Sequence, residues 1–124
     1  MRMQESAEMY LETVLVLRER NGVVRSIDIA NDLGFSRASV SVAIRELAAD
    51  GYIEIDALKQ ITLTESGEAI AQKIYNRHKL LSTLLMRVGV SEETALEDAC
   101  RIEHYISDES IEALQHYYQD IVCG

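Results

Sequence analysis

Residues 26 to 63 constrain the fold more tightly than any other part of this 124-residue chain. Two short helices are predicted over 26–34 and 36–51, each beginning at a serine cap and ending at a glycine. The tight turn "LGFS" between them is typical of a helix-turn-helix. The segment "YIEIDALKQITLT" that follows alternates apolar and polar residues around an irregular middle, which predicts a two-stranded hairpin. A hairpin directly after such a helix pair predicts a winged helix-turn-helix.

The remaining segments predict further helices. One apolar stripe indicates a helix over residues 4–20, and the absence of proline permits long uninterrupted helices later in the chain. We therefore expect a mainly α fold, with an N-terminal winged helix-turn-helix DNA-binding domain over residues 1–64. A second, all-helical domain is expected over residues 65–124. The later helices are expected to begin at Thr64, Ser91 and Ser107.

Composition excludes several classes of protein. No run approaches the ~18 apolar residues of a membrane span, and the start "MRMQESAEMYLE" is not a signal peptide. A soluble, cytoplasmic protein without a membrane partner is therefore expected. The two cysteines, Cys100 and Cys123, are too few for a disulfide framework and are expected to remain thiols. Cys123 lies so close to the end of the chain that an incidental thiol is expected there.

The net charge of −9 argues against indiscriminate binding of nucleic acid. Residues 1–60 hold 7 basic and 10 acidic side chains, whereas residues 61–124 hold 5 and 11. The acidic excess is therefore concentrated in the second half. If the chain binds DNA, we expect the first half to make the contacts, and we expect another source of positive charge to assist it.

The segment "ACRIEHYIS" near the end of the chain combines three residue types that bind metals. Cys100, Glu103 and His104 are spaced i, i+3 and i+4, which predicts that they share one side of a helix. A thiolate, a carboxylate and an imidazole are all ligands for divalent transition metals, and such an ion usually takes at least four. The alternative is an ordinary buried thiol beside a Glu–His pair on the surface.

Two other predicted helices offer further ligands. Met9 and Glu12 share one side of the first helix, and His78 lies midway along the long helix. If the three helices meet, they form one mixed metal site or two adjacent sites. Each residue also has an ordinary interpretation: Met9 as core, Glu12 as a solvated charge and His78 as a surface or capping residue.

The chain resembles the diphtheria toxin repressor and manganese transport regulator (DtxR/MntR) family of metal-activated winged-helix repressors. The matching stretches are "EMYLETV", "DIANDLGFSRASVSVAIRELAADGYI", "LTESGEAIA", "RHKLL" and "IEHYIS", which together span nearly the whole chain. The resemblance implies a repressor that binds double-stranded operator DNA as a homodimer when it is loaded with a divalent metal, with residues 65–124 as its all-helical metal-binding and dimerisation domain. It also implies control of genes for metal-ion homeostasis.

The family has two kinds of primary metal site. The iron-responsive kind has a methionine in the first helix and a cysteine before the Glu–His pair, which Met9 and Cys100 match. The manganese kind has an aspartate and a glutamate at those two positions. Glu12 and His78 match ligand positions of the manganese kind, and His78 also matches an ancillary histidine of the iron kind.

Other family features are missing from this chain. Ser82 and Leu96 stand where the iron kind has an ancillary glutamate and histidine, and the C-terminal SH3-like domain of that kind is not expected here. The chain is therefore similar to a short-form member. Because thioether and thiolate ligands are softer than carboxylates, we expect Fe(II), with Mn(II) second and Co(II), Ni(II) or Zn(II) as surrogates.

The predicted recognition helix and wing supply the expected DNA contacts. Arg37 and Arg45 can reach phosphate or guanine, and Val42 can contact a thymine methyl group. Two alternatives stay open, because Arg45 could pair with an acid and Val42 could be partly buried. The full set of expected DNA-binding residues is Ser36, Arg37, Ser39, Val42, Arg45 and Lys59. The expected dimer interface on the last helix contains Ile111, Leu114 and Tyr118.

Two rival functions remain at this stage. A metal-independent winged-helix regulator would leave the cysteine, glutamate and histidines incidental. A small metalloenzyme would use Glu103 as a base beside a metal-bound water, but it leaves the winged helix unexplained. We therefore expect neither an enzyme nor a small-molecule substrate.

Overall fold

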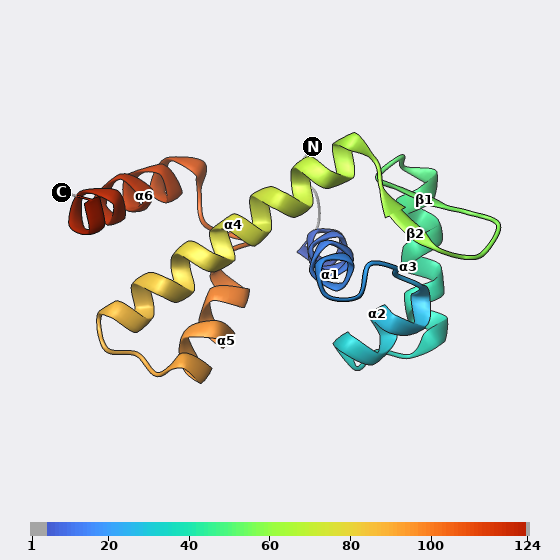
Figure 1. The fold of residues 1–124 in the computed structure, drawn as a ribbon, viewed down its shortest axis with the longest axis horizontal. Coiled ribbons are helices and arrows are strands. Elements are labelled where there is room, and N and C mark those ends of the chain that lie inside the picture. Colours follow the sequence, from blue (N-terminus) through green and yellow to red (C-terminus); the bar gives the residue numbers. More distant parts are fainter. Residues whose placement is uncertain (1–4, 124) are drawn as a thin grey trace. The chain divides into compact units, whose positions relative to one another are not determined.

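The structure is a computed structural model that describes residues 5–123, and the side chain of Cys123, predicted to be an incidental thiol, lies outside the described residues. In this range the chain forms six helices and one two-stranded sheet (Figure 1), which confirms the mainly α prediction. The chain divides into two compact units, Met1–Lys73 and Ile74–Gly124. The elements are α1 (Glu5–Asn21), α2 (Ser26–Leu33), α3 (Arg37–Ala49), β1 (Ile53–Ile55), β2 (Ile61–Leu63), α4 (Glu65–Arg87), α5 (Glu92–Ile102) and α6 (Asp108–Cys123).

The N-terminal unit is the predicted winged helix-turn-helix. Helix α1 packs against α2 and β2, and α3 packs against α2 and β1. The apolar stripe of α1 supplies buried side chains to this core, as do the inward faces of α2, α3 and β1. The buried core residues include Leu11, Leu15, Ile29, Ile44 and Ile53.

The helix caps in this unit agree with the sequence prediction at α3 and differ from it at α2. Ser36 caps α3 as predicted, because its hydroxyl accepts a hydrogen bond from the backbone N–H of Ser39 at 3.2 Å. The prediction that Ser26 caps α2 is wrong, since Ser26 is already helical and Arg25 is the cap residue. The carboxylate of Asp28 accepts the Arg25 N–H at 2.9 Å, so the side chain that closes this cap belongs to the first turn of α2.

The wing is a hairpin in which β1 and β2 are antiparallel, with Ile53 opposite Leu63. At its tip the Asp56 carboxylate accepts the N–H groups of Leu58 and Gln60, both at 2.9 Å. Lys59 has a positive φ of 66° in this turn, and its side chain is exposed. The wing therefore ends in a compact, hydrogen-bonded turn that presents one lysine.

An ion pair joins α1 to the first turns of α4 within the same unit. Arg18 donates to both carboxylate oxygens of Glu68, at 2.7 and 3.1 Å. The hydrogen bond from Arg18 holds the pKa of Glu68 below its ordinary value, and the same bond raises the pKa of Arg18. This bidentate contact fixes the side of α1 that faces α4 in the N-terminal unit.

The C-terminal unit contains the second part of α4, α5 and α6 (Figure 1). Ser91 caps α5 and Ser107 caps α6, each accepting a backbone N–H three residues later, as predicted. The buried apolar residues here include Ile74, Leu81, Ala95 and Ala99. Among the described residues, no helix combines the length and the apolar character needed to cross a bilayer.

Gly67 marks a close approach of α4 to the turn after α3. A Cβ atom at this position would lie 1.9 Å from the carbonyl oxygen of Tyr52, which is a backbone atom and cannot rotate away. The side chain of Thr64 accepts the Gly67 N–H at 3.2 Å, which caps α4 at the same place. Only glycine fits this contact without a shift of the backbone.

Replacing Gly67 should therefore destabilise the N-terminal unit. We expect Gly67→Ala to lower the free energy of unfolding by about 1–3 kcal/mol, measured by urea denaturation. Glu65→Ala, at an exposed position in the same turn, is the matched control and should change it by about 0.5 kcal/mol. Equal stability of Gly67→Ala and the wild type would contradict this account of the contact.

Candidate metal centre

The segment that carries the predicted ligands leaves the helix earlier than its sequence suggests. Helix α5 ends at Ile102, so the prediction that Cys100, Glu103 and His104 all lie on one helix is wrong. Glu103 keeps helical dihedral angles and donates its N–H to Ala99, whereas His104 belongs to the turn before α6. Beyond this end Arg77 of α4 binds the carbonyl oxygens of Glu103 and Ile106, which satisfies backbone acceptors that follow the last helical residue.

Glu103 is the centre of the C-terminal site. Its side chain is 0% exposed, and its two oxygens face different histidines. Oε2 lies 3.0 Å from Nδ1 of His78, and Oε1 lies 3.4 Å from Nε2 of His104. Within the described residues Oε1 has no hydrogen-bond partner. A buried carboxylate oxygen without a donor lowers stability by about 1–3 kcal/mol, and a cation bound near this oxygen would offset that cost.

A thiol completes one side of this centre. One ligand atom each from His78, Cys100 and Glu103 lies within 4.8 Å of the others, which is close enough for a single metal ion. His78 comes from α4, whereas Cys100 and Glu103 come from the end of α5. Since Cys100 is exposed, this side of the site is open to solvent.

The donor set fits a divalent transition metal. Imidazole, thiolate and carboxylate ligands bind Fe(II), Co(II), Ni(II) and Zn(II) well, and carboxylate and imidazole also bind Mn(II). The interpretation of Cys100 as a buried thiol beside a Glu–His pair on the surface is wrong, because Cys100 is exposed whereas Glu103 and His104 are buried. The structure therefore brings together His78, Cys100, Glu103 and His104.

The two other predicted ligands belong to the N-terminal unit. Met9 and Glu12 stand one turn apart on α1, within the helix predicted for them. Their participation in the same site stays a prediction.

Arg77 is a site residue that the sequence analysis did not single out. Its side chain is 8% exposed, and its guanidinium holds the backbone on which Glu103 stands. A signal was present, because Arg77 is three residues after Ile74 and four before Leu81, both buried. A charged residue within the buried stripe of a helix indicates a specific partner.

The exposed face of α3 carries the predicted DNA-binding residues. The side chains of Arg37, Ser39, Val42 and Arg45 are all exposed, and Val42 is 46% exposed. Arg45 donates through Nε to the carbonyl oxygen of Ser41, and among the described residues no carboxylate pairs with Arg37 or Arg45. These guanidinium groups are available to an external anion.

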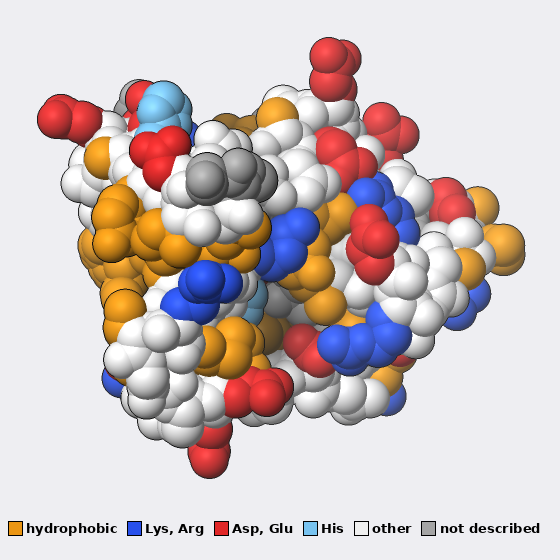
Figure 2. Space-filling view, turned by 60° about the vertical axis from the view of Figure 1, so that its left-hand side comes forward, with side chains coloured by type: hydrophobic (Ala, Val, Ile, Leu, Met, Phe, Trp, Pro, Cys, Tyr) orange, Lys and Arg blue, Asp and Glu red, His pale blue; other side chains and the backbone are white. Residues whose placement is uncertain are grey.

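Helix α6 presents apolar side chains to solvent. The predicted interface residues Ile111, Leu114 and Tyr118 are half-buried, whereas Tyr117, Ile121 and Val122 are exposed. Figure 2 shows hydrophobic side chains gathered over the part of the surface, at the left, that holds the C-terminal unit. An apolar surface of this kind is typical of a contact with another protein.

Comparison with known families covers both halves of the chain. The family described as "Iron dependent repressor, N-terminal DNA binding domain" matches residues 2–60. The family described as "Iron dependent repressor, metal binding and dimerisation domain" matches residues 64–122.

Individual relatives agree with these matches. The chain is 34% identical over 119 residues to an uncharacterized HTH-type transcriptional regulator of Methanocaldococcus jannaschii, covering 94% of this chain and 95% of the relative. It is 34% identical over 116 residues to the transcriptional regulator MntR of Escherichia coli O157:H7, covering 94% of this chain and 75% of the relative.

Solved structures share the fold. The manganese regulator SloR superposes with a TM-score of 0.81 at 26% identity, over 91% of this chain and 53% of that one. IdeR of T. acidophilum superposes with a TM-score of 0.81 at 27% identity, over 95% of this chain and 55% of that one. The chain thus spans about half the length of these solved proteins.

Because Oε1 of Glu103 has no hydrogen-bond donor among the described residues, the stability of the protein should depend on Glu103 both with and without metal. We expect Glu103→Gln to be at least as stable as the wild type in chelator, because it removes a buried charge. The wild type should gain about 2.7 kcal/mol with Co(II) at a hundred times its Kd, and Glu103→Gln should gain almost nothing. Calorimetric melting curves measure both, with Glu97→Gln on the exposed side of α5 as control. Full stabilisation of Glu103→Gln by Co(II) would remove Glu103 from the site.

Proposed function

The chain belongs to the DtxR/MntR family of iron-dependent repressors, and we propose that it is a cytoplasmic, metal-activated repressor that binds operator DNA as a homodimer. Members of the family are transcriptional regulators, so the expectation that the chain is not an enzyme is confirmed. We assign DNA binding to residues 1–64, and metal binding and dimerisation to residues 65–124. The regulated genes are proposed to be those of metal-ion homeostasis.

The buried carboxylate of Glu103 is the observation that carries the metal-dependent part of this proposal. It stands between His78 and His104, Cys100 lies close enough to share a metal ion with it, and among the described residues its Oε1 has no hydrogen-bond partner. A purely structural role for these residues leaves Oε1 unsatisfied, which proteins normally avoid. A metal-independent regulator is therefore the weaker alternative. The residues proposed to hold the ion are Met9, Glu12, His78, Cys100, Glu103 and His104.

Met9 and Glu12 are proposed to link the metal to the DNA-binding unit. Helix α1, on which both stand, packs against α2 and β2. A bound divalent cation supplies positive charge that offsets the carboxylates of Glu12 and Glu103. Ligation through α1 would fix this helix on α2, against which α3 also packs, and so favour the spacing of two recognition helices that fits DNA. The metal stabilises the DNA-competent state by the difference between its binding free energies for that state and for the other state.

The identity of the metal has two candidates. The sulfur atoms of Met9 and Cys100 favour Fe(II), which we propose as the physiological ion. The names of the relatives MntR and SloR, a manganese regulator, support Mn(II) equally well. Co(II), Ni(II) and Zn(II) are expected to act as surrogates in vitro.

The exposed residues of α3 and the wing are proposed to contact operator DNA. Arg37 and Arg45 would contact phosphate or guanine, and Val42 a thymine methyl group. Ser36, Ser39 and Lys59 would contact phosphates. The homodimer is proposed to form through α6, with Ile111, Leu114 and Tyr118 at the interface. The two half-sites should then lie about one helical turn apart, or a multiple of it.

Metal-dependent DNA binding tests the function directly. DNA is selected from a random double-stranded library with anaerobic Fe(II), with Mn(II), or with chelator, and affinities are measured by fluorescence anisotropy. We expect either metal to tighten binding to the selected sequences by about 5–150-fold. Glu103→Gln should lose this gain, whereas Glu97→Gln should keep it. Equal affinity in chelator and in metal would favour the metal-independent regulator.

Exchanging the sulfur ligands tests the choice of metal. The double variant Met9→Asp with Cys100→Glu replaces both soft ligands by carboxylates, so the ratio of Fe(II) to Mn(II) affinity should fall by about tenfold. Calorimetric titration of both ions measures this ratio. Met9→Leu with Cys100→Ser removes sulfur without adding charge, and it should weaken binding of both ions. An unchanged ratio in the carboxylate variant would remove sulfur from the account of selectivity.

A further inference from the structure

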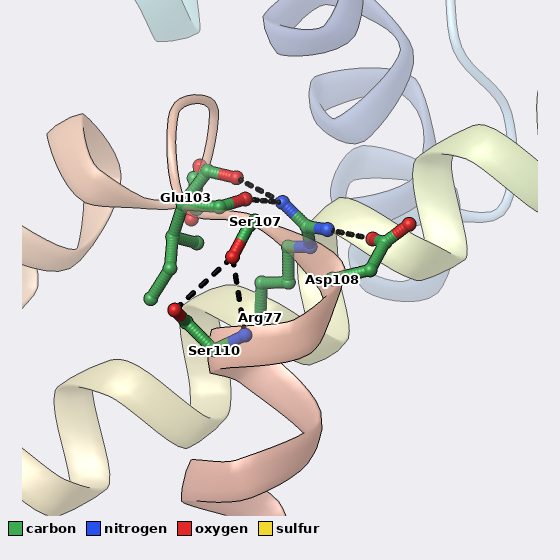
Figure 3. A network of polar contacts seen from close by, with 6 residues as sticks. Arg77, Glu103, Ser107, Asp108 and Ser110 are labelled. Atoms are coloured by element: carbon green, nitrogen blue, oxygen red, sulfur yellow. Dashed lines mark hydrogen bonds and ion pairs between the residues drawn. The ribbon is translucent and has the colours of Figure 1, made fainter.

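Arg77 is a buried cation that the proposed ligand set does not use. It directly precedes His78 on α4, and its side chain is only 8% exposed. Its Nη1 donates to the carbonyl oxygens of Glu103, at 3.2 Å, and Ile106, at 2.7 Å. Its Nη2 donates to Oδ1 of Asp108 (Figure 3). One guanidinium therefore joins the end of α5, the following turn and the first turn of α6.

Neighbouring residues of α4 hold Glu103 at two points. His78 contacts the carboxylate through Nδ1, and Arg77 contacts the carbonyl oxygen of the same residue. The position of the Glu103 carboxylate is therefore tied to the position of its backbone, and the backbone is tied to Arg77. A displacement of Glu103 must either move the guanidinium or break its hydrogen bond.

The guanidinium can transmit such a displacement because it is planar and rigid. Its N–H groups point in fixed directions, so acceptors on Nη1 and Nη2 keep a fixed relation to one another. Asp108 occupies the Nη2 end, and its position in the first turn of α6 also suits the positive end of that helix. Movement at Glu103 therefore reaches the start of α6 through three hydrogen bonds.

We propose that Arg77 is a positioning residue that couples metal occupancy at Glu103 to the order of the first turns of α6, the helix assigned to the dimer interface. This inference rests on the proposed metal-dependent function. Ligation of Glu103 fixes the 103–106 turn, and Arg77 then fixes Asp108 and the helix that begins there. By reciprocity, loss of the Arg77–Asp108 contact weakens metal binding by the factor through which the two are coupled.

Two substitutions in the first turn of α6 distinguish this coupling from the general effect of removing a negative charge. Asp108→Ala removes the carboxylate that Arg77 binds and leaves both carbonyl contacts of Arg77 in place. Glu109→Ala removes the same charge from the same end of α6, and no hydrogen bond or ion pair joins Glu109 to Arg77 among the described residues. Glu109→Ala is therefore the matched control for the interaction of acidic side chains with the helix dipole.

Hydrogen exchange by mass spectrometry, with and without Mn(II), is the measurement. In the wild type and in Glu109→Ala, Mn(II) should slow exchange of the amides of residues 112–115 by about fivefold or more. In Asp108→Ala it should slow them by less than about twofold, while still protecting residues 99–104. The Mn(II) Kd of Asp108→Ala, from calorimetry, should rise by about fivefold at most.

Each contrary outcome has a distinct meaning. If Asp108→Ala keeps the full protection of residues 112–115, the positioning role of Arg77 is overturned and the metal site stands. If its Mn(II) Kd rises by more than about a hundredfold, Asp108 belongs to the metal site itself and the coupling is again overturned. If the wild type binds neither Mn(II) nor anaerobic Fe(II), both this inference and the proposed function fail.

Arg77→Lys provides a second test from the other side of the contact. Lysine keeps the buried positive charge but lacks the rigid fork that joins several acceptors. Where circular dichroism finds the variant folded, protection of residues 112–115 by Mn(II) should fall as in Asp108→Ala. Wild-type protection in Arg77→Lys would show that charge alone, without the fork, is sufficient, and it would overturn the proposal.

Discussion

Two buried charges of opposite sign, Arg77 and Glu103, organise the C-terminal unit. Burial of a charge is costly unless hydrogen bonds and opposite charge replace the lost water. Arg77 meets this condition with two carbonyl oxygens and the carboxylate of Asp108. Glu103 meets it only in part, because Oε1 has no donor within the described residues. The guanidinium of Arg77 is therefore satisfied by the chain itself, whereas the carboxylate of Glu103 is placed to bind an added cation.

The fold was largely predictable because its signals are local. Apolar spacing, serine caps and glycine stops gave the helices and the hairpin to within one or two residues, and the winged helix-turn-helix followed from their order. One error arose where two neighbouring side chains could serve the same cap. At α2 the cap is closed by the carboxylate of Asp28 rather than by Ser26, and spacing alone does not distinguish the two.

The candidate site was predictable in its residues but less so in its geometry. The types and spacing of Cys100, Glu103 and His104 indicated a metal, and the position of His78 was identified. The end of α5 at Ile102 was not predictable, because apolar spacing carries no signal for the contact that Arg77 makes with the carbonyl oxygen of Glu103, 26 positions away along the chain. His104 lies in the turn that follows, yet its Nε2 is still 3.4 Å from Oε1 of Glu103.

The compact tip of the wing presents one lysine, which limits the positive charge that the wing can bring to DNA. Association with a polyanion gains entropy from each counterion that a basic side chain displaces from a phosphate. The proposed reading surface brings only three cations per subunit, Arg37, Arg45 and Lys59, within an acidic chain. The proposed homodimer would bring six, and six phosphate contacts are expected to lose about a thousandfold in affinity between 50 and 200 mM salt. Because phosphate contacts carry no sequence information, target choice would depend on groove-edge complementarity and on duplex shape.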